Sequence, residues 1–353
     1  MKTYRIALYP GDGIGPEVVS EAMRVLQCAA ERFAFHLETT EFPWGADYYF
    51  AHGCVAPPDF LDRLRTFDAI FLGALGDPHR IPDHITLDPL MRMRQGFDQY
   101  ACVRPCRLFR GVPSPLAEPG RIDFVVVREN SEGEYSICGG RMRQGTPEEI
   151  AVQSAVHTRR AVERILRFGF ELAMTRRRRL TMITKSNALR FGLTLWDDVL
   201  EKVRAEYPDV EAERQHADFA AMDFVRRPQR FDVIVASNLF GDILSDLGAA
   251  IVGGLGLASS ANINPERTAP SMFEPVHGSA PDIAGKGIAN PIAQILSGAA
   301  MLEWLGERRA AEQVRSAVDA ALEAGARTPD LGGALTTEQM TDRVLEAMKG
   351  GAL

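Results

Sequence analysis

Several residue types and patterns are rare or missing in this 353-residue sequence, and each absence narrows its function. The five cysteines form no CxxC pair and no zinc-ligand spacing, so we expect reduced thiols rather than a disulfide framework. No apolar run could span a membrane, and the one near the N-terminus is too short for a signal peptide, which favours a cytoplasmic protein. A formal net charge of −7 argues against non-specific nucleic-acid binding.

Lysine is also scarce, with five among the 40 basic residues. Where positive charge alone suffices, this chain uses arginine, so a retained lysine such as Lys185 is a candidate for acid–base chemistry. The four arginines at 176–179 are interpreted as a solvated helix end rather than as a nucleic-acid site.

Short apolar runs alternate with segments of helical periodicity. The runs are rich in Ile, Val and Phe and cover 4–9, 67–75, 122–130, 179–187 and 231–238. Helical periodicity covers 16–33, 148–173, 194–208, 290–307 and 306–325. This alternation predicts an α/β fold with a largely parallel sheet.

The stretch GDGIGPEV at 11–18 lies between the first expected strand and the first expected helix. A dinucleotide-binding fingerprint GxGxxG would need glycine at position 16, where Pro16 stands. Pro16 suits the first position of a helix, and Glu17 suits its positive end. We therefore interpret the stretch as a tight turn between strand and helix.

Three expected strands end in polar residues, at 128–130, 184–187 and 237–238. Sites in parallel sheets lie beyond the carboxyl ends of the strands, so we expect these ends to contribute to one site.

Two aspartates, Asp242 and Asp246, lie four residues apart in NLFGDILSDLGAA and would share one helix face. Like charges at this spacing repel each other unless a cation lies between them, and Mg²⁺ or Mn²⁺ is bound by such oxygen ligands. Asp218 could complete a metal site. Placement of Asp242 in the first helical turn, with Asp246 in solvent, is the simpler interpretation of the pair taken alone.

Further candidates for chemistry are Arg94, Arg104 and Arg128, whose guanidinium groups could bind a substrate with more than one carboxylate. Lys185 could serve as a general base and Tyr135 as a general acid. Each of these residues, taken alone, is also compatible with a structural role.

The segment 273–291, FEPVHGSAPDIAGKGIANP, has neither helical nor strand periodicity, and ordered loops of this length are often functional. Its glycines allow a ligand to approach the backbone. Asp282 could accept hydrogen bonds from a ribose diol and would repel a 2′-phosphate, which favours NAD over NADP.

The motifs GDGIGPE, FDQYxxxRP, TKSN, NLFGDILSD and EPVHGSAPDIAGKGIANP, in this order, resemble those of the β-decarboxylating dehydrogenases. That superfamily includes isopropylmalate, isocitrate, homoisocitrate, and tartrate or D-malate dehydrogenases. RENSEGEYS, GGRMRQGTPEEIAVQ and the NPER insertion are most similar to the tartrate/D-malate branch.

The resemblance implies oxidation of a malate-type 2-hydroxy acid by NAD⁺, followed by loss of CO₂ and protonation of the enol. It assigns the leaving carboxylate to the three arginines, protonation of the enol to Tyr135, and Mn²⁺ or Mg²⁺ to Asp242 and Asp246. It also implies a homodimer with shared active sites, to which Asp218 of the partner subunit would add a metal ligand and Lys185 of the partner subunit the base.

For the cofactor, the resemblance implies that NAD binds to the long loop and to the N-terminal turn. The implied contacts are Ile14, His277, Gly278, Ser279, Ala280, Asp282, Ile283 and Asn290.

In such enzymes the stretch before Arg94 recognises the variable group of the substrate. Here Leu87, Pro89 and Leu90 are apolar and Asp88 is acidic, which disfavours isocitrate and leaves 3-isopropylmalate as the alternative to D-malate or tartrate. The implied fold is a two-domain isopropylmalate/isocitrate dehydrogenase-like α/β fold, not a Rossmann fold. We expect residues 1–100 and 255–353 in the first domain, and 101–254 in a second that carries a dimerisation arm near 136–150.

Overall fold

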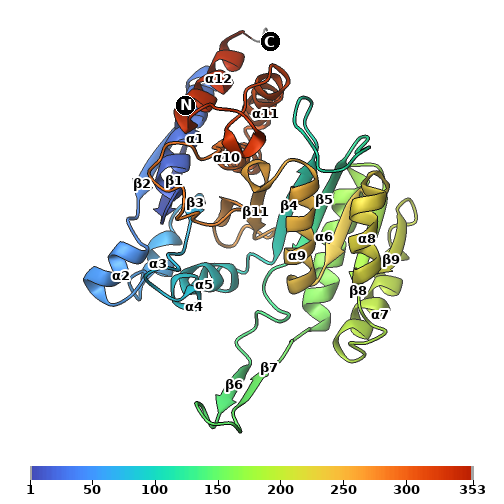
Figure 1. The fold of residues 1–353 in the computed structure, drawn as a ribbon. Coiled ribbons are helices and arrows are strands. Elements are labelled where there is room, and N and C mark those ends of the chain that lie inside the picture. The colour runs from blue at the N-terminus through green and yellow to red at the C-terminus, as the bar shows by residue number, and fades with distance from the viewer. Residues whose placement is uncertain (1, 351–353) are drawn as a thin grey trace.

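The computed structural model describes residues 2–350 and is built around one ten-stranded sheet (Figure 1). Its strands, in spatial order, are β2 (Phe35–Glu41), β1 (Lys2–Gly11), β3 (Ala69–Ala74), β12 (Ser271–Pro275), β11 (Ser259–Ile263), β4 (Ala101–Arg107), β5 (Asp123–Glu129), β10 (Val233–Ala236), β8 (Arg179–Thr184) and β9 (Glu211–His216). All five strands expected from the sequence are confirmed, as is the α/β class.

The sheet consists of two parallel blocks joined by antiparallel strands. β2, β1, β3 and β12 are parallel to one another, and so are β5, β10, β8 and β9. Between the blocks, β11 and β4 pair antiparallel with each other and with their other neighbours. The alternation of strands and helices did not indicate this join, which brings the two blocks side by side.

Helices cover both faces of the sheet (Figure 1). They are α1 (Gly15–Phe33), α2 (Ala46–His52), α3 (Phe60–Leu64), α4 (Asp83–Thr86), α5 (Asp88–Gly96), α6 (Arg159–Met174), α7 (Gly192–Arg204), α8 (Ala217–Arg226), α9 (Asn238–Ile251), α10 (Ile292–Trp304), α11 (Arg308–Glu323) and α12 (Thr337–Gly350), with 3₁₀ turns η1 (Pro228–Arg230), η2 (Leu255–Leu257) and η3 (Pro329–Leu331). The largest buried cluster includes side chains of α1, α6, α7, α10, α11 and α12. Smaller clusters lie under α8 and α9, and under α3 and α5.

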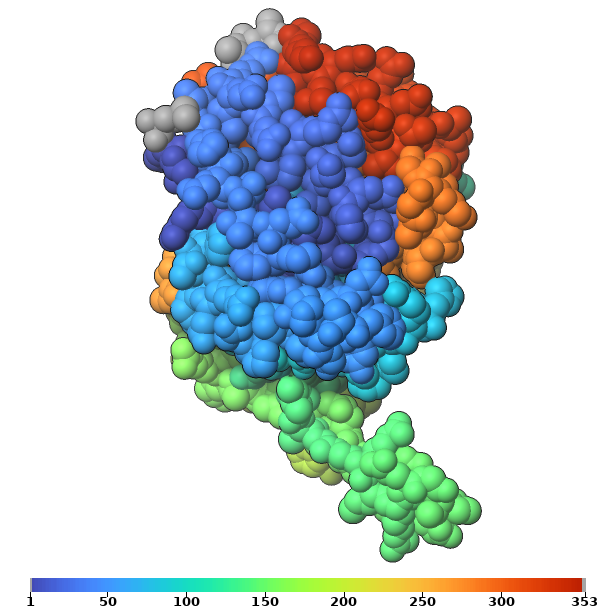
Figure 2. Space-filling view, turned by 90° about the vertical axis from the view of Figure 1, so that its left-hand side faces the viewer, coloured from blue at the N-terminus to red at the C-terminus, as the bar shows by residue number. Residues whose placement is uncertain are grey.

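One expected helix is partly wrong. Residues 148–158 are not helical, because Ile150–Gln153 form β7, which pairs antiparallel with β6 (Gly139–Met142), and α6 begins only at Arg159. The hairpin projects from the body of the protein, where it makes no sheet with the ten main strands (Figure 2). It overlaps the segment expected to form an arm. Its role in a dimer, and the division into two domains across one continuous sheet, remain predictions.

The arginine cluster after α6 is not simply a solvated helix end. Arg176 and Arg177 both form ion pairs with Asp232, whose side chain is fully buried, and Arg176 also pairs with Asp123. These contacts give the first two arginines a structural role.

Among residues 2–350, no helix combines the length and apolar character that crossing a membrane requires.

The turn after β1 supports the long loop that precedes α10. Gly13 has a φ of +57°, and its backbone lies so close to the loop that an added Cβ would be 2.0 Å from the carbonyl oxygen of Ser279. The amide of Ile14 donates to that same oxygen at 2.8 Å. The glycine-rich turn therefore holds the loop in place by backbone contact, and α1 begins directly after it with Pro16 in its first turn.

We predict that Gly13→Ala destabilises the fold much more than Gly53→Ala. Both glycines have positive φ values, so both substitutions should cost about 1 kcal/mol in backbone strain. Gly53 has no neighbour within 4 Å of an added Cβ, whereas alanine at position 13 would overlap Ser279 and cost roughly 2 kcal/mol more. Chemical denaturation measures both losses, and equal losses would contradict the close packing of turn and loop.

Candidate active site

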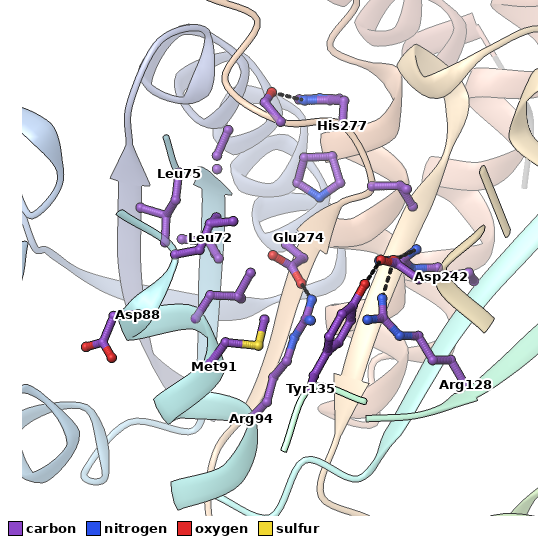
Figure 3. Close-up of a pocket in the computed structure, with 18 of the residues that line it drawn as sticks. Leu72, Leu75, Asp88, Met91, Arg94, Arg128, Tyr135, Asp242, Glu274 and His277 are labelled. Carbon is purple, nitrogen blue, oxygen red and sulfur yellow. Dashed lines mark hydrogen bonds and ion pairs between the residues drawn. The ribbon is translucent and has the colours of Figure 1, made fainter. Parts of the chain in front are cut away.

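A cavity of about 680 Å³ lies where the two blocks of the sheet meet (Figure 3). One wall is mostly apolar and comes from the end of β3 and from residues 84–91. The opposite wall carries charged side chains of β4, β5 and α9, with Arg94 of α5 and Tyr135 beside them, and Ile137 and residues 274–278 complete the lining. The cavity thus places an apolar surface opposite a charged one, as a small polar metabolite would require.

The carboxylate of Asp242 is the centre of the charged wall. Its Oδ1 accepts from Nη1 of Arg104 at 3.0 Å and also from Nη1 of Arg128. Its Oδ2 accepts from the hydroxyl of Tyr135 at 2.7 Å. Asp246, one helical turn later, lies 3.6 Å from Arg104 and is more exposed. The structure therefore brings five of the predicted site residues together.

The electrostatics of the cluster follow from burial and close positive charge. Burial, with the nearby Arg104 and Arg94, lowers the pKa of Arg128 to about 10, so it remains protonated at neutral pH. Burial raises the pKa of Asp242, but Arg128 and Arg104 outweigh it and hold that pKa below its usual value. Burial raises the pKa of Asp246, and Asp242 adds to the effect. A further cation beside both carboxylates would be stabilised there.

Tyr135 is held as a proton donor. Burial and its hydrogen bond to Asp242 raise the pKa of its phenol, and its ring lies 5.2 Å from the guanidinium of Arg128. In Figure 3 its ring stands between Arg94 and Arg128, with the hydroxyl directed at Asp242.

Arg94 is held by a buried polar network that the sequence did not suggest. Its Nη2 donates to Glu274 Oε1 at 2.9 Å, and that oxygen also accepts from Nδ2 of Asn262 at 2.7 Å. Nε of Arg94 and Nε of Arg104 are buried without a hydrogen-bond partner. Glu274 could have been suspected only from its place in the EPVHGSAP motif, and Asn262 from no local signal.

The end of β8 does not reach this cavity. Lys185 donates to Asp218 at 2.6 Å, and both lie outside the lining, on the edge half of the second block. Within residues 2–350, no group of three or more His, Cys, Asp or Glu side chains is arranged to hold a metal ion. One chain therefore provides the carboxylate pair of Asp242 and Asp246, which fits two ligands of a hard cation but not a complete site.

The long loop presents a surface that fits a dinucleotide. Asp282 is exposed, and an added Cβ at Gly278, Gly285 or Gly287 would meet nothing within 4 Å. His277 and Gly278 line the cavity, and Nε2 of His277 is buried without a partner. Burial lowers the pKa of His277, so the ring is neutral at pH 7. The loop is therefore open to solvent at these glycines, and His277 and Gly278 border the cavity.

Two other residues predicted to contact the cofactor, Ile14 and Asn290, contact the loop or the elements beside it. Ile14 is buried with Ala289 and packs against Ala280 and Ile283. Asn290 donates to Asp330 at 3.0 Å and accepts from the amide of Ile292, at the start of α10. The structure places Ile14 and Asn290 in the framework of the loop. Their contacts with NAD remain predictions.

The apolar wall contains Leu90, as predicted, together with Leu87 and Met91 of the same segment and Leu72 and Leu75 at the end of β3. Asp88 is half exposed with its carboxylate 3.7 Å from Arg92, and in Figure 3 it lies on the far side of Met91 from Arg94. Pro89 does not line the cavity.

Comparison with known proteins identifies a family. The family model described as isocitrate/isopropylmalate dehydrogenase matches residues 5–344. The chain is 53% identical to D-malate dehydrogenase (decarboxylating) of Escherichia coli strain K12, over 98% of each chain. It is 51% identical to tartrate dehydrogenase/decarboxylase of Pseudomonas putida, over 96% of each. The crystal structure of isocitrate dehydrogenase from Methylococcus capsulatus superposes with a TM-score of 0.89 at 38% identity, covering 98% of this chain and 99% of that one.

We predict that Asp242→Ala costs about 3 kcal/mol of unfolding free energy, because it leaves two buried guanidinium groups without their shared anion. Asp246→Ala, on the same helix, removes a longer and more exposed contact and should cost less. Malonate should restore stability to Asp242→Ala more than to the unchanged protein at equal ionic strength. Equal costs for the two variants, measured by denaturation, would mean that Asp242 is not the principal counter-charge.

Proposed function

The chain belongs to the isocitrate/isopropylmalate dehydrogenase family, and from this we propose that it is an NAD- and divalent-metal-dependent dehydrogenase that oxidatively decarboxylates D-malate or tartrate. The observation that carries this proposal is the grouping of three arginines, two aspartates and one tyrosine around a single cavity. Relatives named as D-malate and tartrate dehydrogenases, at 51–53% identity over nearly the whole chain, support this choice of substrate.

Arg94, Arg104 and Arg128 bind the carboxylate that is lost. Each side chain is at least nine-tenths buried, so each charge is strong and its position is fixed. Nη2 of Arg128 has no hydrogen-bond partner among residues 2–350. A bound carboxylate would supply an acceptor to this nitrogen without requiring Asp242 to leave both arginines.

Asp242 and Asp246 hold the divalent metal, together with Asp218 of the partner subunit. A bound Mg²⁺ or Mn²⁺ would stabilise negative charge on the substrate's C2 oxygen. Asp282 and the loop at 277–290 would hold NAD, which would supply the hydride acceptor. These assignments agree with the exposed carboxylates of Asp246 and Asp282 and with the open glycines of the loop.

Proton transfer is divided between two groups. Tyr135 has a raised pKa and keeps its proton at neutral pH, so it can protonate the enol once CO₂ has left. Lys185 of the partner subunit removes the proton of the C2 hydroxyl. In one chain Lys185 lies outside the cavity with Asp218, which supports a site completed by a second subunit.

The homodimer, its cytoplasmic location and the discontinuous two-domain division follow from the same proposal. The projecting hairpin exposes Met142, Ile150 and Val152, which suits an arm that docks on another subunit. The apolar wall opposite the arginines would also accept an isopropyl group, so 3-isopropylmalate is the alternative substrate.

We predict that the purified protein reduces NAD⁺ with D-malate or tartrate only when Mn²⁺ or Mg²⁺ is present, and that EDTA abolishes the reaction. D-malate, L-tartrate, meso-tartrate, isopropylmalate and isocitrate are compared by steady-state kinetics. Preference for isopropylmalate would select the alternative substrate, and no turnover of any of the five would contradict the proposed reaction.

We predict that NADP⁺ is the poorer cofactor, and that Asp282→Asn weakens the preference for NAD⁺. Removing one exposed carboxylate near a 2′-phosphate should change the ratio of the two kcat/KM values by about 1 kcal/mol, or roughly fivefold. Asp209→Asn, an exposed aspartate before β9, provides the control. An unchanged ratio in Asp282→Asn would remove this residue from cofactor selection.

A further inference from the structure

We propose that Asn238 is a positioning residue, which orients Arg128 and anchors the loop that carries Tyr135 through one buried side-chain amide. Asn238 is the first residue of α9, and its side chain is almost fully buried. It does not touch the cavity, so it acts through the two residues that do. This inference deepens the proposed function and rests on it for the roles of Arg128 and Tyr135.

The amide oxygen fixes the direction of the guanidinium. Nε of Arg128 donates to Oδ1 of Asn238 at 2.9 Å, and Nη1 donates to Asp242, one turn further along α9. Two acceptors on one helix therefore hold two of the three nitrogens. Among residues 2–350, Nη2 has no hydrogen-bond partner. Asn238 thus leaves one nitrogen free to bind a substrate carboxylate.

The amide nitrogen holds the loop. Nδ2 of Asn238 donates to the carbonyl oxygen of Glu132 at 2.7 Å, three residues before Tyr135. Next to it, Gly133 has a φ of +78°, and an added Cβ would lie 3.0 Å from Cβ of Asn238. Gly133 also forms two backbone hydrogen bonds with Val156, which close the base of the β6–β7 hairpin.

A purely structural role for the amide, such as capping α9, does not explain these contacts. The N-cap of α9 is Ser237, and the side chain of Asn238 bonds to β5 and to the loop instead of to its own helix. Because the two bonds use different atoms of the amide, their effects can be separated. The amide oxygen supports substrate binding because it orients Arg128. The amide nitrogen supports proton transfer because it holds the loop that carries Tyr135.

The experiment compares Asn238→Ala and Asn238→Asp in the full protein, with D-malate, NAD⁺ and Mn²⁺. Alanine removes both bonds and should raise KM for D-malate and lower kcat, each by about tenfold. Aspartate keeps the acceptor for Arg128 but places an oxygen against the Glu132 carbonyl. It should therefore lower kcat by about tenfold, while KM rises less than in Asn238→Ala because Arg128 keeps its orientation.

Asn264→Asp is the matched control. Asn264 is equally buried, donates to the carbonyl oxygen of Phe97 at 2.7 Å and accepts from the amide of Thr268, and does not line the cavity. It should lose stability but keep both kinetic constants. If it reproduces the kinetic pattern of Asn238→Asp, or if Asn238→Ala leaves both constants unchanged, the proposal is overturned.

Hydrogen exchange gives a readout that does not depend on turnover. Amides of residues 131–137 should exchange faster in both Asn238 variants than in the unchanged protein and in Asn264→Asp. Unchanged exchange would contradict the anchoring role. If the unchanged protein oxidises none of the candidate acids, the proposed function fails, and the exchange result alone still decides whether Asn238 holds the loop.

Discussion

The rest of the site depends on the ion pairs that the carboxylate of Asp242 forms with Arg104 and Arg128. Three arginines surround one cavity, and positive charges this close and this buried are tolerated only with negative partners. Asp242 forms ion pairs with Arg104 and Arg128, and Glu274 forms an ion pair with Arg94. Both carboxylates border the space where a substrate would bind. The carboxylate of Asp242 therefore stabilises two buried arginines and holds Tyr135 at the same time.

The sheet topology makes this arrangement possible. Arg104 comes from β4, Arg128 from β5 and Glu274 from β12, and the antiparallel pairing of β12, β11, β4 and β5 brings these strands together. A sheet with only parallel pairs would separate them by crossover connections. Backbone contact between the N-terminal turn and Ser279 then fixes the long loop beside the cavity.

Local patterns in the sequence predicted five of the ten strands of the main sheet, half of the twelve helices within residues 2–350, and the family. The same reasoning misassigned 148–158, where apolar residues spaced as on a helix belong to a hairpin leg and its return to α6. It also did not find Glu274 and Asn238 as partners of the arginines, or Asn262 as a partner of Glu274. Arg94 and Glu274 are 180 positions apart in the sequence, and Arg128 and Asn238 are 110 positions apart. Asn262 reaches Glu274 because β11 and β12 pair antiparallel, and no local spacing indicates that pairing. Lys185 and Asp218 were identified as candidates, but one chain keeps them away from the cavity.

The central claim is that two subunits complete each site, and mixing two inactive dimers tests it most directly. Dimers of Tyr135→Phe and of Lys185→Ala are mixed, subunit exchange is verified by mass, and NAD⁺ reduction is measured. If Tyr135 of one subunit works with Lys185 of the other, half of the dimers become hybrids with one intact site each, and activity recovers to about a quarter of the original. Complete exchange without recovery would contradict the shared site.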